Sequence, residues 1–128
     1  MTEQTPVKAA SAVTLPSTHS VADGLMPVRP GDITLAHVQA YVDAVVTVDD
    51  DAIVDAVLWI FEHAKIVAEP SGAAATAAVL TGAVDAAAAI SGPVVAIVSG
   101  GNMALDTLEE LRRARSARAS HAAAGKLP

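Results

Sequence analysis

The sequence contains no cysteine and very few aromatic residues. Its 128 residues include one Trp, one Tyr and one Phe. Without cysteine, the chain has no means of forming disulfides, thiolate nucleophiles or cysteine-ligated metal sites. Hydrophobic residues still make up 52% of the chain, so alanine, valine, isoleucine and leucine must fill the core. We therefore expect one globular unit in which small side chains let helices and backbone approach closely.

Basic residues and long hydrophobic runs are scarce as well. The 8 Lys and Arg stand against 14 Asp and Glu, a formal net charge of -6, which argues against a nucleic-acid partner because phosphates are bound by clustered cations. The most apolar stretch, residues 73–98, is interrupted by Gly82, Asp85 and Pro93, whereas a membrane helix needs ~20 apolar residues. Residues 1–15 lack the apolar region of a signal peptide. We expect a cytoplasmic protein without membrane contact.

The remaining composition divides the chain into three parts. Residues 1–20 have few long aliphatic side chains and carry prolines, serines and threonines, which predicts an extended N-terminal arm. Residues 21–119 carry the structured pattern, beginning with a loop over 21–31 that is rich in glycine and proline. Residues 120–128 are predicted to be a disordered tail.

Helical spacing and alanine content predict the helices of the folded part. Asp49 to Asp51 supply negative charge to the start of one helix, and its apolar stripe of Ile53, Val57, Ile60 and Phe61 continues toward Val67. The other predicted helices are 35–43 capped by Thr34, 73–81 ended by Gly82, a weaker one over 84–90, and 105–119.

Two segments are predicted to be β-strands. Val45–Val48 is a β-branched run, and Pro93–Val98 is a continuous apolar run of the kind found in parallel sheets covered on both faces. Strands that alternate with helices indicate an α/β architecture. Two strands make a poor sheet by themselves, so the unit is expected to be incomplete.

The passage VVAIVSGGN, residues 94–102, is the strongest chemical signal. Glycines that follow a parallel strand let the backbone approach a ligand, and open α/β sheets bind ligands at such strand ends. Ser99 is therefore a candidate polar contact. The alternative is that Gly100 and Gly101 only turn the chain and that Ser99 caps the next helix.

Two acidic positions are further candidates. Glu69, in AEPSGAAA, precedes a helix of small residues, where it either faces a cofactor or satisfies the helix N-terminus. Asp23-Gly24, in VADGL, either borders a site or forms an ordinary turn. Taken singly, each pattern favours the structural interpretation.

Taken together, four passages resemble one family. VADGL, YVDAVVTVDDDAI, KIVAEPSGAAATAAVLTG and VVAIVSGGN occur in the order found in the C-terminal half of serine/threonine dehydratases, threonine ammonia-lyases and serine racemases. The resemblance extends from about Val13 to about Leu108. It implies part of a three-layer, fold type II pyridoxal-phosphate enzyme domain over residues 21–119, with helices around a small, mostly parallel sheet.

The resemblance also implies a set of cofactor contacts. In the family, the serine of the SGGN segment binds the pyridine nitrogen of pyridoxal 5'-phosphate, which corresponds to Ser99. Gly100 and Asn102 then complete the motif beneath the ring. By the same resemblance Glu69 lies near the cofactor and Gly24 borders its pocket.

Other family elements have no counterpart in this sequence. The resemblance implies that the lysine which binds the cofactor, the substrate loop, the phosphate loop and the acidic cation ligands precede Met1. Lys8, Lys65 and Lys126 do not stand in a matching motif, so we assign no catalytic residue. The four histidines are too scattered along the sequence to predict a metal site.

Two hypotheses from different classes follow. In the first, the chain is a fragment or split subunit of a dehydratase that converts L-serine or L-threonine to a 2-oxo acid and ammonia. It would be inactive alone, would bind the cofactor weakly or not at all, and would associate with itself or with a complementary lysine-containing chain. In the second, it is a non-catalytic remnant or a dimerising or regulatory module. A neighbouring reading frame that encodes the lysine-containing half would favour the first.

Overall fold

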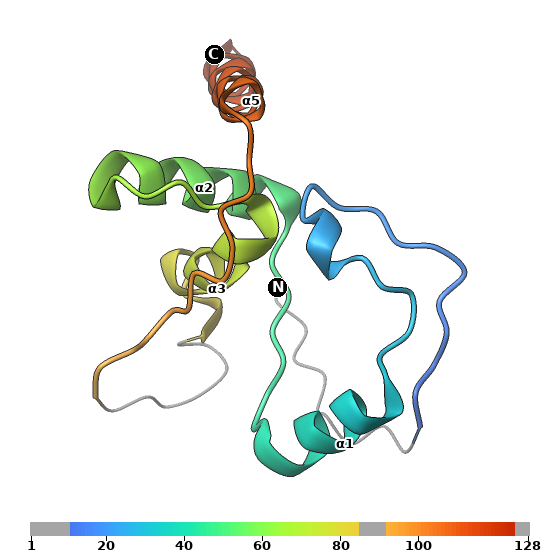
Figure 1. The fold of residues 1–128 in the computed structure, drawn as a ribbon. Coiled ribbons are helices and arrows are strands. Elements are labelled where there is room, and N and C mark those ends of the chain that lie inside the picture. Colours follow the sequence, from blue (N-terminus) through green and yellow to red (C-terminus); the bar gives the residue numbers. More distant parts are fainter. Residues whose placement is uncertain (1–10, 85–91, 125–128) are drawn as a thin grey trace.

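The computed structural model describes residues 11–84 and 92–124 (Figure 1). Its elements in chain order are the 3-10 turn η1 (Asp23–Leu25) and the helices α1 (Asp32–Tyr41), α2 (Asp50–Ala64), α3 (Pro70–Leu80) and α5 (Leu105–Ala124). Most of the weaker helix expected over 84–90 lies outside the described residues. Within those residues no helix is long and apolar enough to cross a bilayer.

Helix α2 forms as its local sequence predicts. The side chain of Asp49 accepts a hydrogen bond of 2.7 Å from the backbone N–H of Ala52 and so caps the helix. The predicted apolar stripe is confirmed at Ile53, Val57 and Ile60, which are buried. It is wrong at Phe61, which is 40% exposed. The helix ends at Ala64, short of Val67, because Lys65 takes a left-handed conformation with φ 59°.

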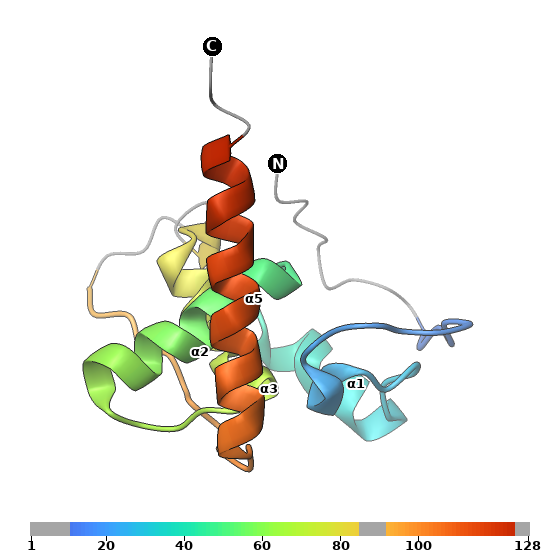
Figure 2. The same cartoon turned by 90° about the horizontal axis from the view of Figure 1, so that it is seen from above.

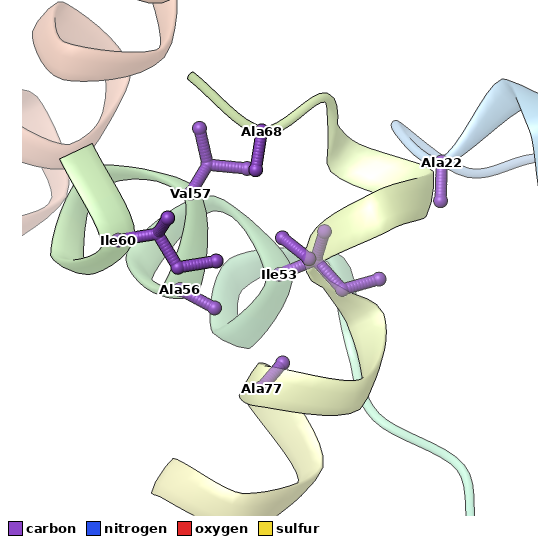
Figure 3. Close-up of a cluster of buried hydrophobic side chains, with 8 residues drawn as sticks. Ala22, Ile53, Ala56, Val57, Ile60, Ala68 and Ala77 are labelled. Carbon is purple, nitrogen blue, oxygen red and sulfur yellow. The ribbon is translucent and has the colours of Figure 1, made fainter. Parts of the chain in front are cut away.

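Helix α3 packs against α2 and begins earlier than its alanine run predicts. Pro70 occupies the first turn, where its missing N–H costs no hydrogen bond. Gly82 follows the helix with φ 71°, which confirms it as the expected stop. The core between these helices is made of small side chains, with Ala73 and Ala77 fully buried. Figure 3 shows this cluster, in which Val57 is the largest completely buried side chain.

Helix α1 stands apart from α2 and α3 (Figure 1). It starts at Asp32 and is preceded by Gly31, so the prediction of a start at Leu35 with Thr34 as cap is wrong. The negative charge of Asp32 interacts favourably with the positive end of the helix dipole. Its carboxylate also pairs with Arg29 at 2.9 Å. Among the described helices, none packs against α1. Its apolar residues Ile33 and Tyr41 are therefore left exposed.

Helix α5 crosses α2 (Figure 2). Leu108 and Leu111 pack against the core, and beyond them Arg115 and Arg118 reach the acidic face of α2. The helix continues to Ala124, past residue 119 where the sequence predicted its end. Residues 120–124 are thus helical, because alanine keeps the helix propensity high and the next glycine is residue 125.

The predicted sheet is not confirmed. Val45–Val48 and Pro93–Val98 are extended rather than helical, but the only ladder contact described for either is an isolated bridge at Val45. A strand needs a neighbour for its N–H and C=O groups, and in residues 11–84 and 92–124 none runs beside these segments. Val95 and Ile97 of the second segment are 83% and 72% exposed.

The N-terminal arm is described from residue 11 onward. Residues 11–20 form no helix or strand. The backbone N–H of Leu15 donates to the carbonyl of Val28 at 2.9 Å, and Ser20 Oγ donates to Asp50 Oδ1 at 2.6 Å. These bonds tie the arm to the loop before α1 and to the start of α2.

Candidate functional site

The predicted site residues come from three segments that meet at the start of α3. The backbone N–H of Gly24 donates to Ser71 Oγ at 2.9 Å, which joins η1 to α3. The backbone N–H of Glu69 donates to the carbonyl of Gly100 at 3.1 Å. In return, the backbone N–H of Asn102 donates to Glu69 Oε2 at 3.0 Å. The structure therefore brings Glu69, Gly100 and Asn102 together and places Gly24 of η1 beside the first turn of α3.

Glycines allow these segments to lie so close. A methyl group on Gly72 would stand 2.6 Å from the carbonyl oxygen of Gly100, and one on Gly101 would overlap the carbonyl oxygen of Val67. At Gly100 the added carbon would overlap the carboxylate of Glu69. Contacts within the chain thus account for all of these glycines, without an approaching ligand.

Glu69 does not act as the helix cap that its position suggests. It occupies the residue before α3, yet its side chain makes no capping hydrogen bond. The carboxylate turns instead to Asn102. At Asp23 the turn interpretation agrees with the structure, since Asp23 Oδ1 accepts a 2.8 Å hydrogen bond from the N–H of Gly24 within η1.

Ser99 is exposed at the end of the extended segment. Its hydroxyl has no hydrogen-bond partner among the described residues. The alternative that Ser99 caps the following helix is wrong, because α5 begins only at Leu105. The hydroxyl is therefore available to a ligand, next to a loop whose backbone is held by Glu69.

Ser71 is a site residue that sequence reasoning missed. Its hydroxyl is the acceptor that links η1 to α3. A methyl group on Gly24 would stand 2.9 Å from that oxygen. The position of Ser71 directly after Glu69-Pro70 was a sequence signal for a site residue. Its hydrogen-bond partner, the N–H of Gly24, lies 47 residues earlier in the chain.

The residues present fit one edge of a heteroaromatic ring better than they fit a phosphate. Ser99 offers a neutral hydroxyl that can donate to a ring nitrogen. A phosphate would favour a helix N-terminus lined by N–H groups or cations, but at the start of α3 the carboxylate of Glu69 supplies negative charge. In the described part of the chain, no group of three or more His, Asp and Glu side chains is placed to hold a metal ion.

A groove of about 460 Å³ lies elsewhere, between η1, α2, α3 and the extended segment 46–48. None of the sequence-predicted site residues lines it. Its walls are mostly apolar and include Ala22, Leu25, Val46, Val48, Ile53 and Ala78. A pyridine nitrogen and a phosphate would find few polar partners there, so we place the candidate site at the Ser99–Asn102 loop.

Comparison with known proteins agrees with the resemblance seen in the motifs. The family model described as pyridoxal-phosphate dependent enzyme matches residues 2–100. The chain belongs to this family. It is 43% identical over 104 residues to a serine racemase of rice, covering 80% of this chain and 30% of the relative. It is 42% identical over 93 residues to the L-threonine ammonia-lyase of Thermotoga maritima, covering 72% and 22% respectively.

Solved structures give the same result. Maize serine racemase matches with a TM-score of 0.72 and 42% identity, over 84% of this chain and 34% of that one. A fungal L-serine ammonia-lyase from Rhizomucor miehei matches with a TM-score of 0.70 and 26% identity, over 84% and 35%. The fold family is therefore that of pyridoxal-phosphate enzymes. The chain spans about a third or less of the length of these relatives.

Proposed function

We propose that this chain supplies the ring-binding edge of a pyridoxal-phosphate-dependent serine/threonine dehydratase and is inactive by itself. The observation that carries the proposal is the meeting of η1, the start of α3 and the Ser99–Asn102 loop beside an unpartnered serine hydroxyl. The reaction class is the conversion of L-serine or L-threonine to a 2-oxo acid and ammonia. Relatives named serine racemase, L-threonine ammonia-lyase and L-serine ammonia-lyase support it.

Each residue has a defined part in this proposal. The cofactor, when bound, withdraws electrons from the α-carbon of the amino acid so that its proton and β-hydroxyl can leave. Ser99 would donate a hydrogen bond from its hydroxyl to the ring nitrogen and, as a neutral partner, would leave that nitrogen largely unprotonated. Gly100 and Asn102 place the loop backbone beneath the ring, while Gly24 borders the pocket from η1.

The one lysine in the described part of the chain, Lys65, is held at the end of α2. Lys65 ends α2, and its Nζ donates to the carbonyl of Glu62 at 2.7 Å. Lys8 and Lys126 lie outside the described residues. Covalent catalysis of this kind needs a positioned amine with a lowered pKa. We therefore propose that residues 21–119 are the C-terminal part of a catalytic domain that needs a complementary lysine-containing chain.

The test is to add pyridoxal phosphate to the purified chain, reduce it with borohydride and map labelled lysines by mass spectrometry. We expect no specifically labelled lysine and no 2-oxo acid from L-serine or L-threonine. One specifically labelled lysine, together with 2-oxo acid production by the isolated chain, would overturn the proposal of an incomplete site.

A complementary chain should restore activity. A practical probe is the part of rice serine racemase that this chain does not match, mixed with the purified chain. We expect cofactor labelling and ammonia release to appear together, and Ser99→Ala to reduce both. Association without any activity would favour the alternative of a non-catalytic module.

A further inference from the structure

We infer that Glu69 is a positioning residue, which holds the 99–102 loop in place and does not itself contact the cofactor. The inference rests on the proposed function only in its link to Ser99. The contacts that define it lie within the chain. It assigns Glu69 a role different from the direct contact that the family resemblance implies.

Glu69 binds the loop from both its main chain and its side chain. Its N–H donates to the Gly100 carbonyl at 3.1 Å, and its Oε2 accepts from the N–H of Asn102 at 3.0 Å. A hydrogen bond to an ionised carboxylate is stronger than one between neutral groups. The two bonds fix the loop at residues 100 and 102, on the side that follows Ser99.

The second carboxylate oxygen also lies against the loop. A Cβ added at Gly100 would overlap Glu69 Oε1, so a side chain at that position would displace the carboxylate. A Cβ on Gly72, in the first turn of α3, would meet the backbone of Gly100. Both oxygens of Glu69 therefore lie beside the loop backbone.

The consequence is that Glu69 affects a ligand only through the loop. If the bond to Asn102 is removed, the backbone after Ser99 loses its anchor and the serine hydroxyl loses its fixed direction. Removal of this hydrogen bond should therefore weaken ring binding in a chain that still contains Ser99. In a chain without the Ser99 hydroxyl, loss of Glu69 should cost nothing further.

A double-mutant cycle on the full chain tests this. The probe is pyridoxine 5'-phosphate, which keeps the ring nitrogen and phosphate but has no aldehyde to react with lysines. We expect Ser99→Ala and Glu69→Ala each to weaken binding about fivefold, as for one hydrogen bond. The Ser99→Ala/Glu69→Ala double variant should bind like Ser99→Ala alone. Glu69→Gln, whose amide oxygen can still accept from Asn102, should restore most of the affinity. Losses that multiply in the double variant would overturn the inference.

Amide hydrogen exchange provides a readout that needs no cofactor. We expect the Asn102 amide to exchange roughly tenfold faster in Glu69→Ala, as for loss of a charge-assisted bond. Exchange should be unchanged in Ser99→Ala and near the original rate in Glu69→Gln. Unchanged exchange at Asn102 in Glu69→Ala would overturn the inference. If the unaltered chain did not bind the probe, the ring-binding role proposed for the isolated chain would fail, while the exchange result would still decide the role of Glu69.

Discussion

Alanine substitutions at the site glycines distinguish a glycine that packs against backbone from one that packs against a movable side chain. A methyl group on Gly72 or Gly101 meets backbone atoms, whereas one on Gly100 meets the end of the Glu69 side chain. Backbone has no rotamer to escape into, so we expect Gly72→Ala and Gly101→Ala to cost about 2–3 kcal/mol of unfolding free energy. Gly100→Ala should cost about 1 kcal/mol, the value of the displaced hydrogen bond.

Urea unfolding measures these differences, and Gly31→Ala is the matched control. Its nearest neighbour would be Thr34 Oγ1 at 3.5 Å, an ordinary contact. The control should change stability by less than about 0.5 kcal/mol. Equal costs at positions 31, 72 and 101 would contradict the close packing described here.

Lys65 is the one described residue other than glycine with a positive φ, 59°. It stands where helices favour glycine. We expect Lys65→Gly to raise the unfolding free energy by about 0.5–1 kcal/mol, because the Cβ clash is removed. Lys65→Ala keeps that clash and loses the same side chain, so it should give no gain. A gain shared by both variants would mean that the lysine side chain, and not the backbone, is unfavourable.

At the scale of single residues, sequence alone found much of the candidate site. Gly24, Glu69, Ser99, Gly100 and Asn102 were all predicted from motifs, although their roles toward a cofactor remain predictions. The sequence alone could not show the hydrogen-bond partners of these residues. The bond from Asn102 to Glu69 joins residues 33 apart, and no local pattern specifies which side chain a backbone N–H will reach.

Among the elements, the contact between α2 and α5 is the most dependent on charge. Arg118 pairs with Asp51 and with Asp55, the latter at 3.3 Å, and Arg115 pairs with Asp55 at 3.4 Å and Glu62 at 3.5 Å. These groups are partly exposed, so each pair contributes at most about 1 kcal/mol. We expect Arg118→Ala to lower the unfolding free energy by about 0.5–1 kcal/mol.

The salt dependence of the stability lost in Arg118→Ala shows whether the loss comes from ion pairs. The difference between Arg118→Ala and the unaltered chain should shrink at about 1 M salt, where charges are screened within about 3 Å. Arg113→Ala is the control, since Arg113 pairs only with Glu109 of its own helix among the described contacts. An Arg118→Ala effect that persists unchanged in high salt would indicate lost packing.

Within α5, Glu109 should titrate at unusually low pH. Hydrogen bonds from Arg112 and then Arg113 lower the pKa of its carboxyl from 4.5 to about 2. Because the pKa is lowered in the folded helix, the stabilisation is present above pH 4.5 and is lost as the pH falls toward 2. Carbon-13 NMR of the Glu109 carboxyl measures the midpoint. Arg112→Ala should raise it toward the ordinary value, and Arg118→Ala should leave it unchanged.

Element boundaries show where local sequence signals suffice. The start of α2 follows from Asp49 and its stripe, because capping and periodicity are local. The alanine run predicts that α3 begins at residue 73, but the helix begins at Pro70, because proline suits the first turn of a helix. The predicted sheet is not confirmed for a different reason, because a sheet depends on neighbouring strands that lie outside each segment.

For the whole molecule, exposed apolar segments predict association. Val95 is 83% exposed on a segment without neighbouring strands among the described residues, and such surfaces promote contact with other chains. We expect sedimentation velocity to show concentration-dependent self-association that Val95→Lys reduces. Thr34→Lys, which adds the same charge at an exposed polar position of α1, is the matched control and should associate like the unaltered chain. A clean monomer at high concentration, with no dye-detectable apolar surface, would contradict this expectation.

In the proposed function, the cofactor ring binds where η1, the start of α3 and the Ser99–Asn102 loop meet. NMR of the uniformly labelled chain, titrated with pyridoxine 5'-phosphate, tests it most directly. We expect weak binding, with backbone amide shifts concentrated at Gly24, Gly100 and Asn102. Shifts confined to Val46, Val48 and the other walls of the apolar groove, or no shifts at all, would contradict it.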